Sequence, residues 1–132
     1  MASDQLRVVQ EGLAAFNRRE FDEALGKFSP ELEWDTTRLL PDGRVYSGRE
    51  AVRAYWADVV ERWDELRIEA DRWLEGADCV LMLGRLVGRG AGAGVPVEGP
   101  WHQLWWFRGA VLVRCDNYSD EAAALRDAGL AG

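Results

Sequence analysis

Apolar residues recur at intervals of three and four over much of residues 1–63, which is the spacing of one face of a helix. This pattern predicts three helices, over residues 3–16, 21–28 and 48–63. A serine can cap the first helix, and a Ser-Pro pair ends the second, because proline has no backbone N–H to continue a helix. Residues 32–37 alternate like a short strand, which a loop rich in turn residues connects to the third helix.

From residue 66 onward the apolar period changes to two, the period of a β-strand. Turns that contain glycine divide this part of the chain into four predicted strands, over residues 66–76, 79–90, 95–107 and 110–119. The phase slips near Arg72, which predicts a β-bulge. A short helix over residues 120–129 is expected to close the chain. Helices followed by an antiparallel meander predict an α+β fold, with residues 1–132 as a single domain.

Several predicted strands are apolar on both faces, at residues 80–83, 104–107 and 111–113. An antiparallel sheet with one face in water alternates apolar and polar side chains instead. The N-terminal helices can cover only one face of the sheet. We therefore expect a second subunit to cover the other face, which gives a homodimer packed sheet to sheet.

The composition narrows the class of protein. The 132 residues are 48% hydrophobic and 30% charged, with a formal net charge of −7, which predicts an ordinary soluble domain with a substantial core. The acidic balance and the lack of a basic stripe argue against binding to nucleic acid or to an anionic membrane surface. The sequence suggests neither a secretory signal nor a membrane-spanning segment, so a cytoplasmic protein is expected.

Two features that can signal chemistry give weak signals here. Cys79 and Cys115 match neither a metal-ligand spacing nor a CxxC redox motif, so we expect buried, reduced thiols and no metal or cofactor. The glycine-rich run GRGAGAG, residues 88–94, has no following helix and no Gly-Lys-Ser/Thr ending. It is therefore expected to be a mobile hairpin tip and not a phosphate-binding loop.

Four segments spread along the chain carry more specific patterns: FDEALGKFSPELEW, GREAVRAYW, GRGAGAGVPVEG and NYSDEAAAL. Together they resemble the second helix and first strand, the third-helix start, the hairpin and the last-strand motif of the SnoaL-like proteins. This superfamily also includes nuclear transport factor two and the ketosteroid isomerases. The resemblance implies a cone-shaped fold in which N-terminal helices and a curved, mostly antiparallel sheet enclose an apolar pocket. It does not imply a reaction, because one fold hosts many functions.

The resemblance also indicates where the groups of a ketosteroid isomerase would lie. Those enzymes use a carboxylate base, together with a tyrosine and a protonated aspartic acid that form an oxyanion hole. Without a gap, the base position falls on Thr36, and a shift of one residue places Asp35 there instead. The tyrosine position falls on Gly12 and the aspartic-acid position on Gln103. Steroid isomerisation by that mechanism is therefore not expected.

Two other branches of the superfamily give further candidates. In the limonene-epoxide-hydrolase branch an Asp-Arg-Asp set activates water, and Arg85 matches the arginine. Val87 and Asn117 replace the two aspartates, and an amide cannot act as a general base. The SnoaL-like cyclases use an acidic residue in an aromatic pocket, for which Asp35 and Asp116 are candidates. Strict alternation points Asp116 out of the pocket, so Asp35 is the candidate catalytic residue.

The family alignment makes Gln103 face the pocket, and a period of two then assigns its neighbours to faces. The predicted pocket wall contains Trp34, Thr36, Tyr55, Trp56, Trp63, Arg85, Gln103, Trp105 and Asn117. The predicted outer face, which would contact the partner subunit, contains His102, Leu104 and Trp106. For Arg85 two roles stay open, because a buried guanidinium can anchor a ligand anion or pair with an acidic side chain.

These observations favour a cytoplasmic homodimer that binds a small, largely apolar molecule, aromatic or polycyclic, oriented by Arg85, Gln103 and Asn117. If the protein is an enzyme, the fitting chemistry is proton transfer next to a carbonyl, as in an isomerase, cyclase or dehydratase, with Asp35 as the base. The alternative is a non-catalytic ligand-binding or dimerisation module of the same fold.

Overall fold

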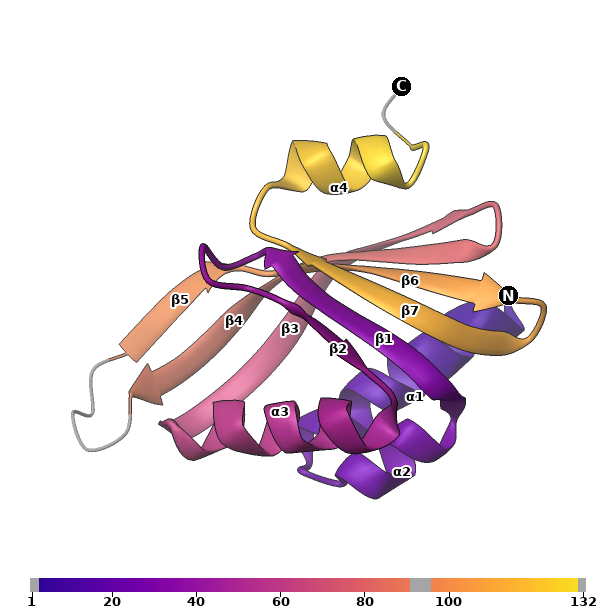
Figure 1. Cartoon of the computed structure of the whole chain (residues 1–132). Helices are drawn as coiled ribbons and strands as arrows, with labels where there is room; N and C mark the ends of the chain where they lie inside the picture. The colour runs from indigo at the N-terminus through magenta and orange to yellow at the C-terminus, as the bar shows by residue number, and fades with distance from the viewer. Residues whose placement is uncertain (1–2, 91–95, 131–132) are drawn as a thin grey trace.

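Helices come first and strands later along the chain in the computed structural model, which describes residues 3–90 and 96–130 (Figure 1). The helices are α1 (Asp4–Asn17), α2 (Phe21–Gly26), α3 (Arg49–Glu61) and α4 (Glu121–Asp127). The strands are β1 (Phe28–Arg38), β2 (Val45–Ser47), β3 (Trp63–Gly76), β4 (Cys79–Gly90), β5 (Pro96–Pro100), β6 (His102–Arg108) and β7 (Val111–Tyr118). The α+β class predicted from the sequence is confirmed. Within the described residues, no helix combines the length and the apolar character needed to cross a membrane.

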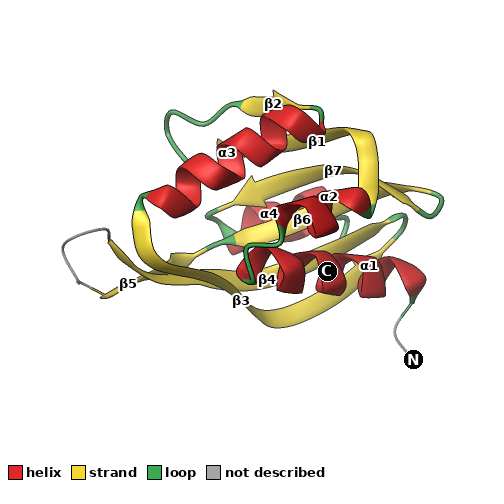
Figure 2. Cartoon of the chain, turned by 90° about the horizontal axis from the view of Figure 1, so that it is seen from below, coloured by secondary structure: helices red, strands yellow, loops and turns green. Residues whose placement is uncertain are grey.

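The strands form one sheet in the order β2-β1-β7-β6-β4-β3, and β5 pairs with the C-terminal half of β4. The β1–β7 pair is parallel, whereas the other pairs are antiparallel. Helices α1, α2 and α3 lie on one side of this curved sheet, and α4 lies on the other (Figures 1 and 2). We call the side that faces α1–α3 the inner face and the side that faces α4 the outer face.

The predicted elements are largely confirmed, including the bulge in β3, which falls between Ala70 and Arg72. Three boundaries were wrong. Strand β1 starts at Phe28 and includes a proline, which lies in the irregular part of the β1–β7 ladder. The predicted loop before α3 contains β2, which pairs with β1. The predicted strand over residues 95–107 is interrupted at Trp101, since β5 and β6 pair with different parts of β4. Of the expected mobile tip, residues 88–94, residues 88–90 belong to β4 and residues 91–94 lie outside the described residues.

The inner core is built by α1–α3 against the sheet and is unusually aromatic. Trp56 of α3 makes edge-to-face contacts with Phe16 of α1 and with Trp34 of β1, at ring-centroid distances of 5.2 and 5.1 Å. Trp34 in turn meets Trp105 of β6 at 5.4 Å. Helix α1 can approach the start of β1 closely because residue 12 is glycine. A Cβ added at Gly12 would come within 2.6 Å of the Phe28 ring. Aromatic side chains from α1, α3, β1 and β6 therefore form one continuous core.

The outer face carries a second, smaller core under α4. Its buried members are Cys79, Leu81, Leu83, Leu104, Tyr118 and Ala124. The Tyr118 hydroxyl donates a hydrogen bond of 2.7 Å to Asp127, and Arg38 pairs with the same carboxylate, which ties α4 to the sheet. Part of the outer face, for which we expected a partner subunit as the cover, is thus covered by the chain itself. For Leu104 and its neighbours the chain's own C-terminal helix supplies the cover.

Candidate functional site

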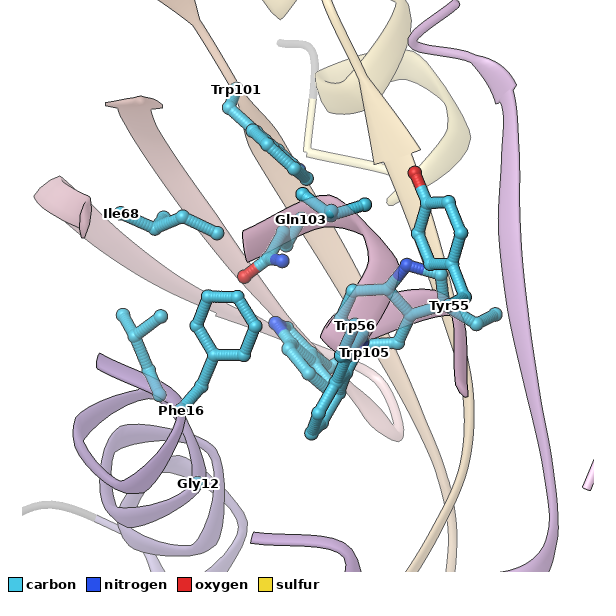
Figure 3. A pocket seen from close by; sticks show the side chains of 11 residues that line it. Gly12, Phe16, Tyr55, Trp56, Ile68, Trp101, Gln103 and Trp105 are labelled. Atoms are coloured by element: carbon cyan, nitrogen blue, oxygen red, sulfur yellow. The ribbon is translucent and has the colours of Figure 1, made fainter. Parts of the chain in front are cut away.

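A small recess lies between α1, α3 and the inner face of the sheet (Figure 3). We call it the inner recess. Its lining consists of Gly12, Leu13, Phe16, Trp34, Tyr55, Trp56, Val59, Ile68, Trp101, Gln103 and Trp105. The enclosed volume is about 20 Å³, which is room for about one water-sized group. The inner recess therefore has room for about one small group.

A larger opening, which we call the mouth, adjoins the inner recess and has a volume of about 710 Å³. Its lining consists of Thr36, Leu39, Leu40, Asp42, Gly43, Arg44, Tyr46, Tyr55, Asp58, Val59, Arg62, Trp63, Leu86, Val97, Gly99, Pro100, Trp101 and Ser119. Tyr55, Val59 and Trp101 line both spaces and so mark their junction. These three side chains therefore separate the inner recess from the mouth and contribute to both.

Three indole rings contribute buried N–H groups to the inner recess. Trp34, Trp56 and Trp105 are each at most 3% exposed. Their Nε1 atoms have no hydrogen-bond partner among the described residues. An indole N–H can only donate, and buried donors are nearly always paired in folded proteins. The recess thus holds donor capacity that the chain itself does not use.

The polar side chain of the inner recess, Gln103, belongs to a short buried network. The indole of Trp101 donates to Asn117 Oδ1 at 2.8 Å, and Gln103 Nε2 donates to the same oxygen at 3.2 Å. Asn117 Nδ2 in turn donates to the backbone carbonyl of Asp35 at 3.0 Å. Gln103 is 1% exposed, and its Oε1 has no partner among the described residues. Asn117 therefore positions Gln103 and does not itself line the recess.

Tyr55 stands at the junction of the inner recess and the mouth. It stacks on Tyr46 with the ring centroids 4.2 Å apart. Burial, reinforced by the nearby Tyr46, raises the pKa of Tyr55 to about 12. The phenol is therefore protonated at neutral pH and presents a hydroxyl group, not a phenolate, to a ligand.

Charged side chains gather at the mouth and not in the inner recess. Arg62 pairs with Asp58 one turn earlier in α3 at 2.8 Å, and Asp42 and Arg44 lie on the facing loop. Tyr55 is the one titratable side chain in the lining of the inner recess. Among the described residues, no cluster of His, Cys, Asp or Glu could hold a metal ion. Chemistry that needs a charged group would therefore take place at the mouth.

The structure resolves the register of the first strand. Trp34 faces the inner recess and Thr36 lines the mouth, as one of the two registers predicted. The Thr36 hydroxyl donates to the backbone carbonyl of Arg44 at 3.0 Å, so it fixes the loop after β1. Asp35 faces outward, pairs with Arg114 at 2.8 Å, and lines neither space. Its assignment as a pocket base is thus not supported by its position.

Arg85 is the predicted pocket residue that lies on the wrong face. Its guanidinium pairs with Asp71 at 2.6 Å and with Glu98 at 3.3 Å on the outer side of the sheet. The physical reason is the register, because Gln103 pairs directly with Met82 and opposite residues of an antiparallel ladder share a face. Arg85 is three positions from Met82 and so points the other way. Of its two open roles, the structure gives it ion pairing.

The remaining predictions about site residues fall where expected or nearly so. Trp56 and Trp105 line the inner recess, Tyr55 lines both spaces, and Trp63 lines the mouth. Of the predicted partner contacts, His102 and Leu104 are buried within the chain, and Trp106 is half-buried. Contact of a partner with His102 or Leu104 is therefore corrected, and only Trp106 stays available.

Sequence reasoning missed the contribution of α1 and β3 to the site. Gly12, Leu13 and Phe16 bring one face of α1 to the inner recess, and Ile68 brings β3. Their apolar spacing was visible in the sequence, but it does not distinguish a recess wall from an ordinary core. One third of the mouth lining comes from the segment between β1 and α3, which the sequence suggested only as a loop.

Comparison with known proteins places this geometry in context. The SnoaL-like domain family matches residues 9–115. No curated protein sequence matches the chain. An NTF2-like protein of unknown function from Burkholderia pseudomallei is 22% identical, with a TM-score of 0.78 over 95% of this chain and 97% of its own.

Two further solved structures share the architecture. TerC, crystallised with polyporic acid, is 18% identical, with a TM-score of 0.77 over 96% of this chain and 98% of its own. A candidate SnoaL-like polyketide cyclase from Shewanella putrefaciens is 10% identical, with a TM-score of 0.77 over 97% of each chain. At these identities the similarity shows a shared fold, with helices packed on a curved sheet, and no shared activity.

Proposed function

The chain belongs to the SnoaL-like domain family, as its sequence motifs predicted, and from this premise we propose that it binds a small, largely apolar molecule between its helices and its sheet. The observation that carries the proposal is the mouth, about 710 Å³, which lies beside the aromatic inner recess and shares Tyr55, Val59 and Trp101 with it. The mouth combines four aromatic side chains with polar and charged ones, and a concave space of this order with aromatic walls and convergent polar groups is typical of small-molecule sites.

The aromatic lining indicates what such a molecule gains on binding. Tyr55 and Trp101 at the junction, with Trp63 further out, present flat apolar surface toward the mouth. Flat aromatic ligands stack on such side chains and bury a large area per ring. TerC, a protein of the same fold, was crystallised with an organic molecule, polyporic acid. That example supports the capacity of the fold for ligands and does not identify the ligand of this chain.

Proton transfer next to a carbonyl is the second candidate function, favoured by the carboxylates at the mouth. Asp42 and Asp58 line that space, and Asp58 is paired with Arg62. Within the inner recess Tyr55 is the titratable side chain, and a pKa of about 12 makes it a poor general base at neutral pH. Ligand binding without catalysis therefore has more support than isomerase, cyclase or dehydratase activity.

A homodimer through the outer face is part of the proposal. Helix α4 covers only one portion of that face, and Trp106 and Val113 of the neighbouring strands are half-buried in the single chain. Val111, at the start of β7, is 48% exposed. An incompletely covered sheet face with an indole on it is typical of an interface between subunits.

Isothermal titration calorimetry with neutral polycyclic aromatics and steroids tests the binding proposal. We expect at least one compound of this panel to bind the wild-type protein. Val59→Phe should weaken that binding about tenfold or more, because the larger side chain fills the junction at a cost typical of overpacking. Val111→Phe is the matched control, since Val111 lines neither space, and it should leave the affinity unchanged.

Two results would contradict the proposal. One is that no compound of the panel binds the folded wild-type protein. The other is that Val59→Phe and Val111→Phe weaken binding equally, which would place the ligand outside the two recesses. For the catalytic alternative, Asp42→Asn and Asp58→Asn should each reduce turnover of a bound ketone, and unchanged turnover in both variants would exclude these carboxylates as bases.

A further inference from the structure

The orientation of one buried amide indicates what the inner recess recognises. The Trp101 indole can only donate a hydrogen bond, and the Asp35 backbone carbonyl can only accept one. Asn117 bonds to both, so its oxygen must face Trp101 and its nitrogen must face Asp35. Gln103 also meets the oxygen of Asn117, which requires Gln103 to offer its nitrogen there.

The consequence is that the oxygen of Gln103 is directed away from this network. Gln103 Oε1 is buried and has no partner among the described residues. Figure 3 shows this oxygen pointing into the recess, toward Phe16. The Trp105 Nε1 is also buried without a partner. The recess therefore offers an acceptor and a donor that are held in place but unused.

Volume and charge restrict the group that can use both atoms. The enclosed space of about 20 Å³ admits one group of about the size of water. The lining carries no ionised side chain at neutral pH, because Tyr55 is protonated. A carboxylate or an ammonium group would therefore lose its hydration without a counter-charge, which is costly.

Building on the proposed function, we propose that the inner recess takes the hydroxyl group of a neutral aromatic or alicyclic alcohol whose ring system lies in the mouth. The hydroxyl donates to Gln103 Oε1 and accepts from the Trp105 indole. A ketone or ether oxygen can accept from the indole but leaves the Gln103 oxygen unpaired. A hydrocarbon leaves both unpaired. A site built to bond a hydroxyl discriminates strongly against analogues that lack it.

Three ligands with the same ring system test this proposal by calorimetry: 2-naphthol, naphthalene and 2-methoxynaphthalene. The wild-type protein should bind 2-naphthol at least about tenfold more tightly than the other two, which corresponds to one well-made buried hydrogen bond. Gln103→Met removes the acceptor at similar volume and should abolish this preference while retaining naphthalene binding. Trp105→Phe should reduce the preference, since it removes the donor and keeps an aromatic ring. Gln10→Met, outside both recesses, is the matched control.

The outcomes separate this proposal from the one on which it rests. Equal affinity of the wild-type protein for 2-naphthol and naphthalene overturns the hydroxyl site and leaves ligand binding intact. Retention of the full preference in both Gln103→Met and Trp105→Phe also overturns it. Failure of all three compounds, together with the whole aromatic panel, overturns both proposals. If Gln103→Met does not fold, the three-ligand series on the wild-type protein and on Trp105→Phe still decides the question.

Discussion

The two faces of the sheet differ in how their polar side chains are paired. On the outer face the guanidinium of Arg114 forms ion pairs with the carboxylates of Glu33, Asp35 and Asp116 at 2.7–3.0 Å. On the inner face the polar atoms are neutral, and several of them are buried without a partner in the described chain. An unpaired buried polar atom lowers the stability of the folded chain. Such atoms on the inner face therefore indicate a role other than stabilising the fold.

The aromatic residues of the two faces show the same contrast. The indole of Trp106, on the outer face, donates to Asp116 at 3.0 Å. The indoles of Trp34, Trp56 and Trp105, on the inner face, are more deeply buried but donate to nothing described. A tryptophan whose N–H is satisfied within the chain contributes to structure. Trp34, Trp56 and Trp105 contribute packing through their rings, whereas the indole of Trp101, which also lines the inner recess, is satisfied by Asn117.

Removing one tryptophan from each face gives the largest expected effect. Trp56→Ala should lower the free energy of unfolding by about 3–5 kcal/mol, because the ring packs against Phe16, Phe21 and Trp34 in a fully buried site. Trp106→Ala should cost about 1–2 kcal/mol, since that ring is only half-buried. Urea unfolding followed by circular dichroism measures both. Equal losses would show that the two faces do not differ in packing.

The oligomeric state tests whether the outer face is complete in a single chain. Multi-angle light scattering at micromolar concentration should give the mass of a dimer. Trp106→Glu should shift the protein toward the monomer, because it places an unpaired charge beside Asp116 in the proposed interface. The inner-face ligand affinity should not change. A wild-type monomer under these conditions would contradict the proposed homodimer.

The smallest expected effect concerns the histidine on the outer face. The Nδ1 of His102 accepts a hydrogen bond of 3.1 Å from the Gly84 backbone N–H, which requires a neutral ring with the proton on Nε2. Burial lowers the pKa of His102 from its ordinary value of 6.5, although Glu121 and Asp120 oppose that change. Just below pH 6.5 the unfolded chain therefore binds a proton that the folded chain does not.

The free energy of unfolding should consequently be highest above that pH and decrease as the pH falls toward the folded-state pKa. Urea unfolding between about pH 5 and pH 8 measures this dependence. His102→Gln removes the titrating group and should flatten the profile over the same range. An identical slope in the wild type and the variant would assign the pH dependence to other groups.

The sequence predicted the faces of β6 and of the C-terminal part of β7 correctly, but it placed Val113 inward, where a register shift turns it outward, and it predicted the face of β4 incorrectly. In β6 and β7, inward Gln103 and Asn117 were assigned from the alignment, and strict alternation placed His102 and Asp116 outward. In β4 both faces are apolar, so alternation carries no information about which residues point inward. The cross-strand pairing of Met82 with Gln103 decides it, and that pairing does not exist until the strands meet.

The role of α4 was predictable only in part. Its position and its cap were expected, and the Asp120 side chain does accept from the Ala122 backbone N–H. The apolar outer positions of β4 and β6 were correctly recognised as needing a cover. The element that covers these positions is set by the path of the chain after β7. The hydrogen bond from Tyr118 to Asp127 holds α4 in that place. The sequence contains Tyr118 and Asp127 but does not show that their side chains are in contact.

The sequence by itself determined the order of helices and strands, the bulge in β3, the family and the presence of many aromatic side chains facing one interior. The elements and the aromatic content follow from local periodicity and composition, which each segment carries alone, whereas the family was inferred from the resemblance of four segments to the SnoaL-like proteins. The tertiary structure decided which of these side chains surround a recess, that Asp35 and Arg85 lie outside it, and that Asn117 turns the Gln103 oxygen inward. Such properties arise from pairing between distant segments, where a shift of one residue exchanges the two faces of a strand.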